Sequence, residues 1–256
     1  MVHGMVMLVF IYSTCLLLVQ RVEAADPDPL VDFSANATTP VFRNIFANGD
    51  VSIGSGGVRA ALDIGKFPGL TSEGLTVVQF KMVPCGENVP HTHPRATELL
   101  SLISGGPLQA GFVDTKGYDI CNLMQIIIGF AYVLDGYVNP FPDILLLDHL
   151  TAGQAQIHIL YPGDLIVFPR GLLHFELNVG TETAFYLSAL NSQNPGTLDA
   201  AGAVLQLPER AAAIAFNQDI ATVGALKSQR PYNEPPTLEA AKPGVCVPGQ
   251  LISTTV

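Results

Sequence analysis

The sequence predicts an all-β protein, an antiparallel double-sheet barrel of the jelly-roll type with α-helices at its C-terminal end. The 256 residues include 24 Gly and 19 Pro but only 13% charged residues, a composition typical of turn-rich β proteins. Short runs with strand propensity recur between residues 75 and 190 with turn residues between them, and helix signals gather only after residue 200. At 48% hydrophobic, the chain is long enough for one substantial core.

The N-terminus reads as a secretory signal peptide over residues 1–24. Residues 5–19 are mostly apolar, and Val22 and Ala24 fit the small-residue positions of a cleavage site. A membrane anchor is the alternative, but a run of about 15 residues is short against the ~20 needed to span a bilayer. We therefore expect a secreted protein that begins at Ala25 and has no membrane attachment after cleavage.

Residues 25–74 form a predicted N-terminal extension. It contains one sequon at Asn36, which in a secreted chain is a candidate glycosylation site; an unmodified loop asparagine is the alternative.

The predicted barrel domain covers residues 75–200. Alternation of apolar side chains and intervening turn residues place its strands. The Gly105-Gly106-Pro107 stretch is expected to split one pair of them. The predicted strands are 75–83, 99–103, 108–113, 155–160, 165–168, 173–179 and 183–190.

The remaining residues, 201–256, are predicted to form C-terminal helices and a tail. Pro208 followed by an acidic residue is a standard helix start, and the stretch through residue 229 should form two short helices broken near residues 217–219. The Pro- and Gly-rich residues 235–256 are expected to be loosely ordered.

The most informative stretch is residues 86–98, which contains His91, His93 and Glu98. Alternate side chains of a strand share a face, so the two histidines can aim at one point, and a bend at Pro94 could bring the carboxylate there. Such a set suits a first-row ion such as Mn, Fe or Zn. Two half-exposed strand histidines are the plainer alternative, but His174, behind a Pro-x-Gly turn, supplies a third imidazole.

Two stretches, Pro90-His91-Thr92-His93-Pro94-Arg95-Ala96-Thr97-Glu98 and Phe168-Pro169-Arg170-Gly171-Leu172-Leu173-His174-Phe175, resemble the paired motifs of the cupin superfamily, and specifically those of plant germins and germin-like proteins. The resemblance implies a cupin barrel and a manganese ion held by His91, His93, Glu98 and His174. It also implies an apoplastic or cell-wall location, and trimers clasped by the C-terminal helices that can pair into hexamers.

Two enzyme activities follow from the resemblance. Germin-like proteins with superoxide dismutase activity need only a redox-active ion with an open position, so this activity ranks first, and superoxide would be the small anionic substrate. Germins that oxidise oxalate carry two asparagines near the metal. Asn88 matches one of them and is a tentative catalytic residue close to the ligands, but Val78 occupies the other position. A third possibility is a non-catalytic metal-binding, storage or cell-wall protein.

The segment 117–152 does not fit the family, whose chains join the equivalent strands by a short turn. About 36 residues without clear structure are unusual inside a compact domain. The segment is either a lid helix or interface element, or a retained intron, which we favour slightly. Its removal would leave Asp114-Thr115-Lys116-Gly-Gln154, an ordinary turn.

Cysteine usage also departs from the family. Ser34 stands where germins carry the first cysteine of an N-terminal disulfide, so that bridge is missing. Cys15 leaves with the signal peptide, and the remaining Cys85, Cys121 and Cys246 cannot all pair within one chain. Cys85, next to the first motif, is either incidental or a redox-active thiol, and we favour the first.

The net charge of −10 argues against a nucleic-acid partner, which requires a basic surface. It also provides no long-range attraction for a small anion, so an anionic substrate would depend on the local field of a metal ion.

Overall fold

The computed structural model describes residues 39–114, 154–229 and 237–250. The predicted signal peptide, Asn36, Cys121 and the whole segment 117–152 lie outside these residues. The strands and helices belong to one compact unit, residues 24–114 and 155–256; a second unit, residues 1–23 and 115–154, falls outside the described residues except for Gln154. No helix among the described residues is long and apolar enough to cross a membrane.

The described chain is mainly β, as predicted. Its helices are α2 (Ile45–Asn48), η1 (Pro68–Leu70), α4 (Ala200–Gln206), α5 (Glu209–Phe216) and α6 (Ile220–Gln229). Its strands are β1 (Asp50–Gly54), β2 (Gly57–Leu62), β3 (Thr76–Met82), β4 (Gly86–Thr92), β5 (Glu98–Asp114), β6 (Gln154–Leu160), β7 (Leu165–Phe168), β8 (His174–Leu190), β9 (Leu198–Asp199) and β10 (Glu239–Ala240).

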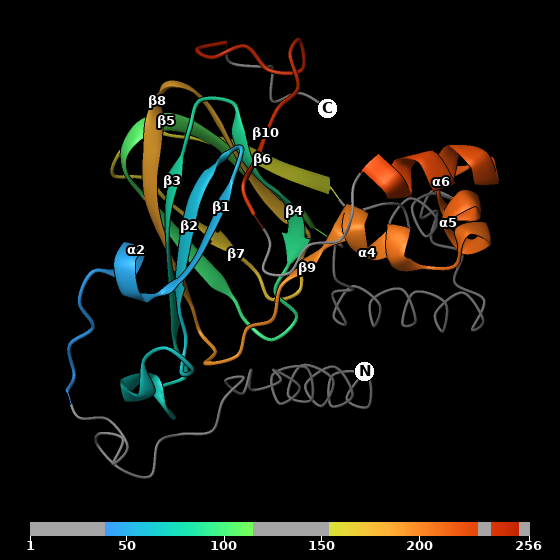
Figure 1. Cartoon of the computed structure of the whole chain (residues 1–256). Coiled ribbons are helices and arrows are strands. Elements are labelled where there is room, and N and C mark those ends of the chain that lie inside the picture. The colour runs from blue at the N-terminus through green and yellow to red at the C-terminus, as the bar shows by residue number, and fades with distance from the viewer. Residues whose placement is uncertain (1–38, 115–153, 230–236, 251–256) are drawn as a thin grey trace, which may run out of the picture. The chain divides into compact units, whose positions relative to one another are not determined.

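The ten strands form one hydrogen-bonded sheet in the order β1-β2-β3-β8-β4-β10, with β5 pairing to β6, β7 and β8 and β9 pairing to β4 (Figure 1). The pairs β1–β2, β2–β3, β3–β8, β4–β8, β4–β9, β4–β10, β5–β7 and β5–β8 are all antiparallel. Strands β1 and β2 lie within the predicted extension 25–74 and continue the sheet beyond β3. The extension therefore supplies one wall of the barrel.

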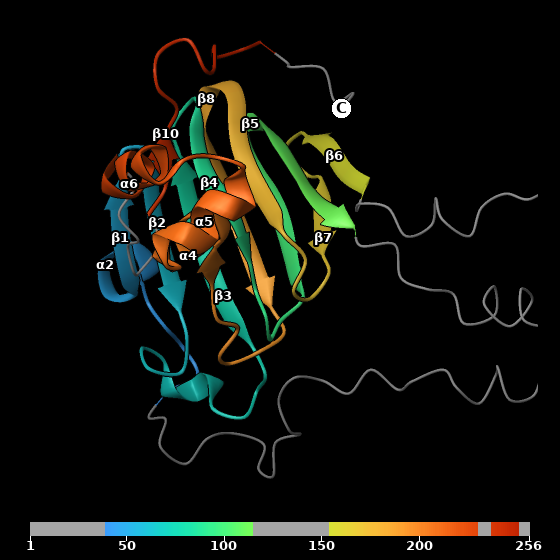
Figure 2. The same ribbon diagram turned by 90° about the vertical axis from the view of Figure 1, so that its right-hand side faces the viewer.

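Two strands are longer than predicted. β5 and β8 each run unbroken for 17 residues side by side (Figure 2), so the predicted splits at residues 104–107 and 180–182 are wrong. The glycines there produce register irregularities along the β5–β8 pair instead of turns. Gly106 and Gly180 approach so closely that a β-carbon on Gly180 would overlap the Gly106 carbonyl oxygen, which explains why glycine is required.

The core lies between the inward faces of these strands. Its fully buried members include Tyr186, Phe168, Met82, Leu100 and Leu102. Alternation along β8 buries every second residue from Ala184 to Leu190, as a strand with one face on a core requires.

The C-terminal helices gather beside β4 and β9 in Figure 1, and α4 contacts both strands. They share a small core of Leu205, Ala212, Ala213 and Val223. The predicted break is confirmed, since α5 ends at Phe216 and its C-cap residue Asn217 has the left-handed conformation. Helix α4 was not predicted, although Asp199, whose side chain accepts a hydrogen bond from Gly202 N, is a recognisable N-cap.

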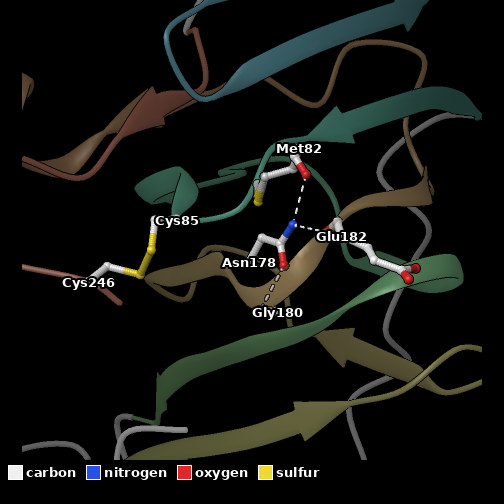
Figure 3. The surroundings of a disulfide bond; sticks show 6 residues. All are labelled: Met82, Cys85, Asn178, Gly180, Glu182 and Cys246. Carbon is white, nitrogen blue, oxygen red and sulfur yellow. Dashed lines mark hydrogen bonds between the residues drawn. A yellow bond between two sulfur atoms is a disulfide. The ribbon is translucent and has the colours of Figure 1, made fainter. Parts of the chain in front are cut away.

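The described part of the tail, residues 237–250, is more ordered than predicted. Leu238 is fully buried in the barrel core, and β10 pairs with β4. A disulfide joins Cys246 to Cys85 beside β4, while nearby Asn178 donates hydrogen bonds to the Met82 and Glu182 carbonyls (Figure 3). The prediction that Cys85 is incidental is therefore wrong. This pairing was hidden in the sequence because its two cysteines are 161 residues apart.

Candidate metal centre

The structure brings the four predicted ligand residues together. His91 lies in β4 and His93 immediately after it, while Glu98 opens β5 and His174 opens β8. Because His91 and His174 are directly paired across β4 and β8, their rings lie 4.2 Å apart between centroids. One ligand atom from each of the four residues lies within 4.8 Å of the others, and all four residues are buried.

Each imidazole is fixed by its Nδ1 atom. The Nδ1 atoms of His91, His93 and His174 lie 2.8, 2.6 and 2.8 Å from the carbonyl oxygens of Val89, Gly196 and Leu172. A carbonyl oxygen can only accept, so each Nδ1 carries the proton and donates it. Each ring therefore presents its Nε2 atom to the centre, where the Nε2 lone pair can bind a metal ion that displaces any Nε2 proton, the arrangement that orients metal-binding histidines.

The bend between His93 and Glu98 is held by the segment 191–197. Arg95 donates from Nε to the Asn194 carbonyl at 2.6 Å and from Nη2 to the Asn194 side chain at 2.8 Å. Thr97 N donates to the Asn191 side chain at 2.7 Å. The chain turns back after Pro94, as the sequence predicts. These hydrogen bonds hold the turn and so place the Glu98 carboxylate beside the histidines.

An aromatic floor supports the third histidine. The ring of Phe168, at the end of β7, stacks on His174 with centroids 4.5 Å apart and an interplanar angle of 18°. Phe168 is almost completely buried, so it excludes water from that side of the centre. Its packing limits rotation of the imidazole about its side-chain bonds.

The charges favour ligation by neutral imidazoles and an ionised carboxylate. Burial, together with the rings of His174 and His93, lowers the pKa of His91 well below 6.5. Burial alone would raise the pKa of Glu98, but the Nε2 atoms of His174 and His93, at 3.5 and 3.0 Å, hold that pKa well below 4.5. The two shifts leave the Glu98 carboxylate anionic and the His91 imidazole uncharged at neutral pH.

The donor set fits a metal ion. His174 Nε2 is buried without a hydrogen-bond partner, although buried polar atoms are normally satisfied. An ion at the common point of the four residues would give it one. Three imidazole nitrogens and one carboxylate oxygen suit Mn, Fe or Zn and leave positions open on a six-coordinate ion.

A small cavity adjoins the centre. Its volume, measured as the space open to the centre of a water-sized sphere, is about 20 Å³. His91, His93 and Glu98 form part of its lining. Val78 and Asn88, the two positions that the resemblance singled out, both line it. A larger hollow of about 420 Å³ over β6 and β7 contains none of the four ligand residues, so the small cavity is the one relevant to chemistry.

Sequence reasoning missed three polar residues on the inward faces of β2 and β8. Arg59 lies directly opposite Phe80, which lies opposite Tyr186, in one row across β2, β3 and β8; Ser188 occupies the next inward position. Arg59 and Ser188 line the cavity. The atoms Arg59 Nη1, Tyr186 Oη and Ser188 Oγ are buried without a hydrogen-bond partner. We call Arg59, Tyr186 and Ser188 the Arg59 wall.

Glu176 was also missed. It is fully buried two residues after His174 and hence on the same face of β8, a signal that the period of a strand could have given. Burial and the nearby Glu98 raise the pKa of Glu176 well above 4.5. The Asn88 side chain, from the directly opposite position on β4, opposes part of that rise.

Comparison with known proteins agrees with this geometry. The cupin family profile, described as Cupin, matches residues 43–224. Germin-like protein subfamily 1 member 7 of Arabidopsis thaliana is 35% identical over 191 residues, covering 73% of this chain and 67% of the relative. Germin-like protein 4-1 of Oryza sativa subsp. japonica is 32% identical, covering 74% and 70%.

Among solved structures, an oxalate oxidase matches with a TM-score of 0.58 at 24% identity, over 80% of this chain and 97% of the other, a likeness of fold. The predicted barrel with C-terminal helices and the predicted family are both confirmed. The chain belongs to the cupin family and, within it, to the germin-like proteins.

Proposed function

We propose that the protein is a secreted, manganese-dependent enzyme of the superoxide dismutase type. The observation that carries this proposal is the convergence of three Nε2 lone pairs and the Glu98 carboxylate on one buried point beside a small cavity. His91, His93, Glu98 and His174 would hold the ion. Bound manganese would supply one-electron redox chemistry and a positive charge that attracts a small anion.

The residues around the ion have separate tasks in this proposal. The backbone carbonyls that accept from Nδ1 keep the three rings oriented before the metal arrives. Phe168 and Val78 exclude bulk water. The cavity admits only a molecule of a few atoms. A site with these properties suits superoxide better than a larger acid.

Oxalate oxidation is the second candidate, favoured by the fold shared with an oxalate oxidase. Val78 weakens it, because this buried side chain lines the cavity at the position where the resemblance implies an amide. An oxalate oxygen facing Val78 would lack a partner, at a cost of about 1–3 kcal/mol and more for a charged group. Since each 1.4 kcal/mol is about tenfold in rate, useful turnover would be lost.

Several features support an extracellular location. Disulfides such as Cys85–Cys246 persist in oxidising compartments, and the relatives are germin-like proteins. With the predicted cleavage after Ala24, we propose secretion to the apoplast or cell wall. Assembly into trimers or hexamers is part of the proposal, supported by exposed apolar side chains such as Ile214 on the C-terminal helices. N-terminal sequencing and sedimentation of the extracellular protein test both points.

Metal analysis and paired activity assays test the function. Purified protein should contain one manganese per chain, dismutate superoxide and produce no hydrogen peroxide from oxalate. The His174→Ala variant is the control for adventitious metal. Peroxide from oxalate at a rate comparable to that of an oxalate oxidase would favour the second candidate. Full manganese with neither activity would favour a non-catalytic metal-binding, storage or cell-wall role.

A further inference from the structure

A half-buried arginine lines the same cavity as three residues of the candidate metal centre. Arg59 is half-buried as a residue, but its Nη1 atom is shielded from solvent and has no hydrogen-bond partner. Among the described residues, no carboxylate forms an ion pair with its guanidinium. Such a group is costly to bury, because an unpaired charge loses its hydration without compensation.

The direction of Arg59 follows from the sheet. It shares the inward face of β2 with the core residue Ala61 and lies opposite the core residue Phe80. It lines the same cavity as His91 and Glu98. Burial lowers the pKa of Arg59 from 12.5, and the charges of Asp50 and Glu98 among others counter that fall, so the side chain remains a cation.

Ser188 provides a second unused group in the same cavity. Its Oγ atom is buried and has no hydrogen-bond partner. A hydroxyl and a guanidinium that share a cavity with three of the four ligand residues form a donor set for an anion. The apolar neighbours Val78 and Phe80 between them lower the local polarity and strengthen such contacts.

We propose that Arg59 and Ser188 form an anion-binding subsite that receives a small anion while it occupies the open side of the metal centre. The inference rests on the proposed function for the presence of a metal ion. The cavity has room for about two or three heavy atoms, so the anion is superoxide or an anion of similar size, such as a one-carbon carboxylate. Arg59 is thus a substrate-positioning residue on β2, a strand that carries none of the four ligand residues.

Calorimetric titration with azide and with formate tests the subsite without relying on turnover. Wild type, Arg59→Met, Arg59→Lys and Ser188→Ala are compared, each loaded with manganese and metal-free. The Arg59→Met variant should bind azide at least about tenfold more weakly, because a charge-assisted hydrogen bond is lost. Arg59→Lys should recover part of the affinity through its charge, and Ser188→Ala should lose less than Arg59→Met.

Arg210→Met is the matched control, because it removes the same charge from the exposed surface of α5. It should bind azide as the wild type does. Metal content and thermal unfolding are measured for every variant. Arg59→Met should keep full metal content and equal or higher stability, since it removes an unpaired buried charge. A purely structural role would instead lower the stability and leave azide affinity unchanged.

The probes also separate the two sources of anion. Azide and formate both weakened by Arg59→Met would identify a subsite that accepts carboxylates; azide binding without formate binding would identify one restricted to small inorganic anions. Unchanged azide affinity in a metal-loaded Arg59→Met variant, or a wild type that binds neither anion in either form, would overturn the inference. Protein that binds azide through Arg59 but does not dismutate superoxide would overturn only the proposed function.

Discussion

The ligand histidines and the Arg59 wall differ in how their polar groups are satisfied. On the ligand side, every imidazole donates through Nδ1 to a backbone carbonyl, so each ring is held in one orientation. On the Arg59 wall, Nη1, Tyr186 Oη and Ser188 Oγ have no partner. The difference matches two kinds of ligand. The histidine rings are oriented for an ion that stays bound, and the Arg59 wall has unsatisfied hydrogen-bonding groups for an anion that binds and leaves.

The most severe way to break the ligand side is to replace His91 and His93 together with alanine. Two of the four donors would be lost, and the double variant should retain no stoichiometric metal. Elemental analysis of purified protein measures this. His158→Ala, on the exposed side of β6, is the control and should keep one metal per chain. A full equivalent of metal in the double variant would show that the ligand set is wrong.

A weaker intervention is Phe168→Ala, which removes the support beneath His174. Loss of a fully buried phenylalanine should lower the free energy of unfolding by about 3–5 kcal/mol and should reduce metal affinity by freeing the ring. Chemical denaturation and metal titration measure the two effects. Phe216→Ala, on the partly exposed end of α5, should change neither appreciably. Unchanged metal affinity in Phe168→Ala would mean that the Nδ1 hydrogen bond alone orients His174.

Removing a polar group from the Arg59 wall should not appreciably lower the free energy of unfolding, unlike the Phe168→Ala change. Tyr186→Phe removes a hydroxyl that has no partner, so stability at pH 7 should stay within about 1 kcal/mol of the wild type or rise. Tyr161→Phe, at an exposed position, is the matched control. A loss of more than 2 kcal/mol would show that the hydroxyl has a partner, and the contrast between the walls would weaken.

The stability of the Tyr186→Phe variant should also depend on pH differently from that of the wild type. Burial, with Glu176 and Glu98 nearby, raises the pKa of Tyr186 well above 10. The unfolded chain ionises first as the pH passes 10, so the contribution of Tyr186 is fully present below pH 10 and is lost as the pH rises toward the folded-state value. The Phe variant should lack that part of the alkaline decline, which denaturation between pH 8 and 11 would measure.

The smallest expected effect is that of deleting residues 118–152 while keeping Gly117. The segment contributes none of the described ligand or Arg59-wall residues, and β5 and β6 on either side of it pair with each other. Metal content and azide affinity should therefore match those of the full chain. A deletion variant that lost its metal or its soluble oligomer would show that the segment is a structural element rather than a retained intron.

Local patterns predicted the ligand side better than the Arg59 wall, for a physical reason. His91, His93 and Glu98 sit within eight residues, and the bend at Pro94 could be anticipated from the ring's lack of an N–H. Arg59 is not marked by such a pattern. Its strand, Gly57–Leu62, lacks alternation, and its neighbours at the cavity come from β3, β4, β5 and β8, so only the folded register brings it inward.

The predicted strand boundaries were wrong where the local sequence is compatible with both a turn and a continuous strand. Gly105-Gly106-Pro107 is a turn signal, yet here the same glycines permit two long strands to pass each other with shifted register. The prediction of a loosely ordered tail was wrong for a different reason. Its order depends on Leu238 and Cys246 meeting the barrel far away in sequence, which composition cannot reveal.

The bridge between Cys85 and Cys246 changes what a protease can do to this chain. All four ligand positions lie between the two cysteines. A single cut anywhere in that interval, including residues 115–153, would leave two polypeptides that remain one molecule. Such nicked protein would migrate as an intact species in an electrophoretic gel and separate into two bands only after a reductant is added. Proteolytic processing would therefore convert the chain into a two-chain form without separating His91, His93 and Glu98 from His174.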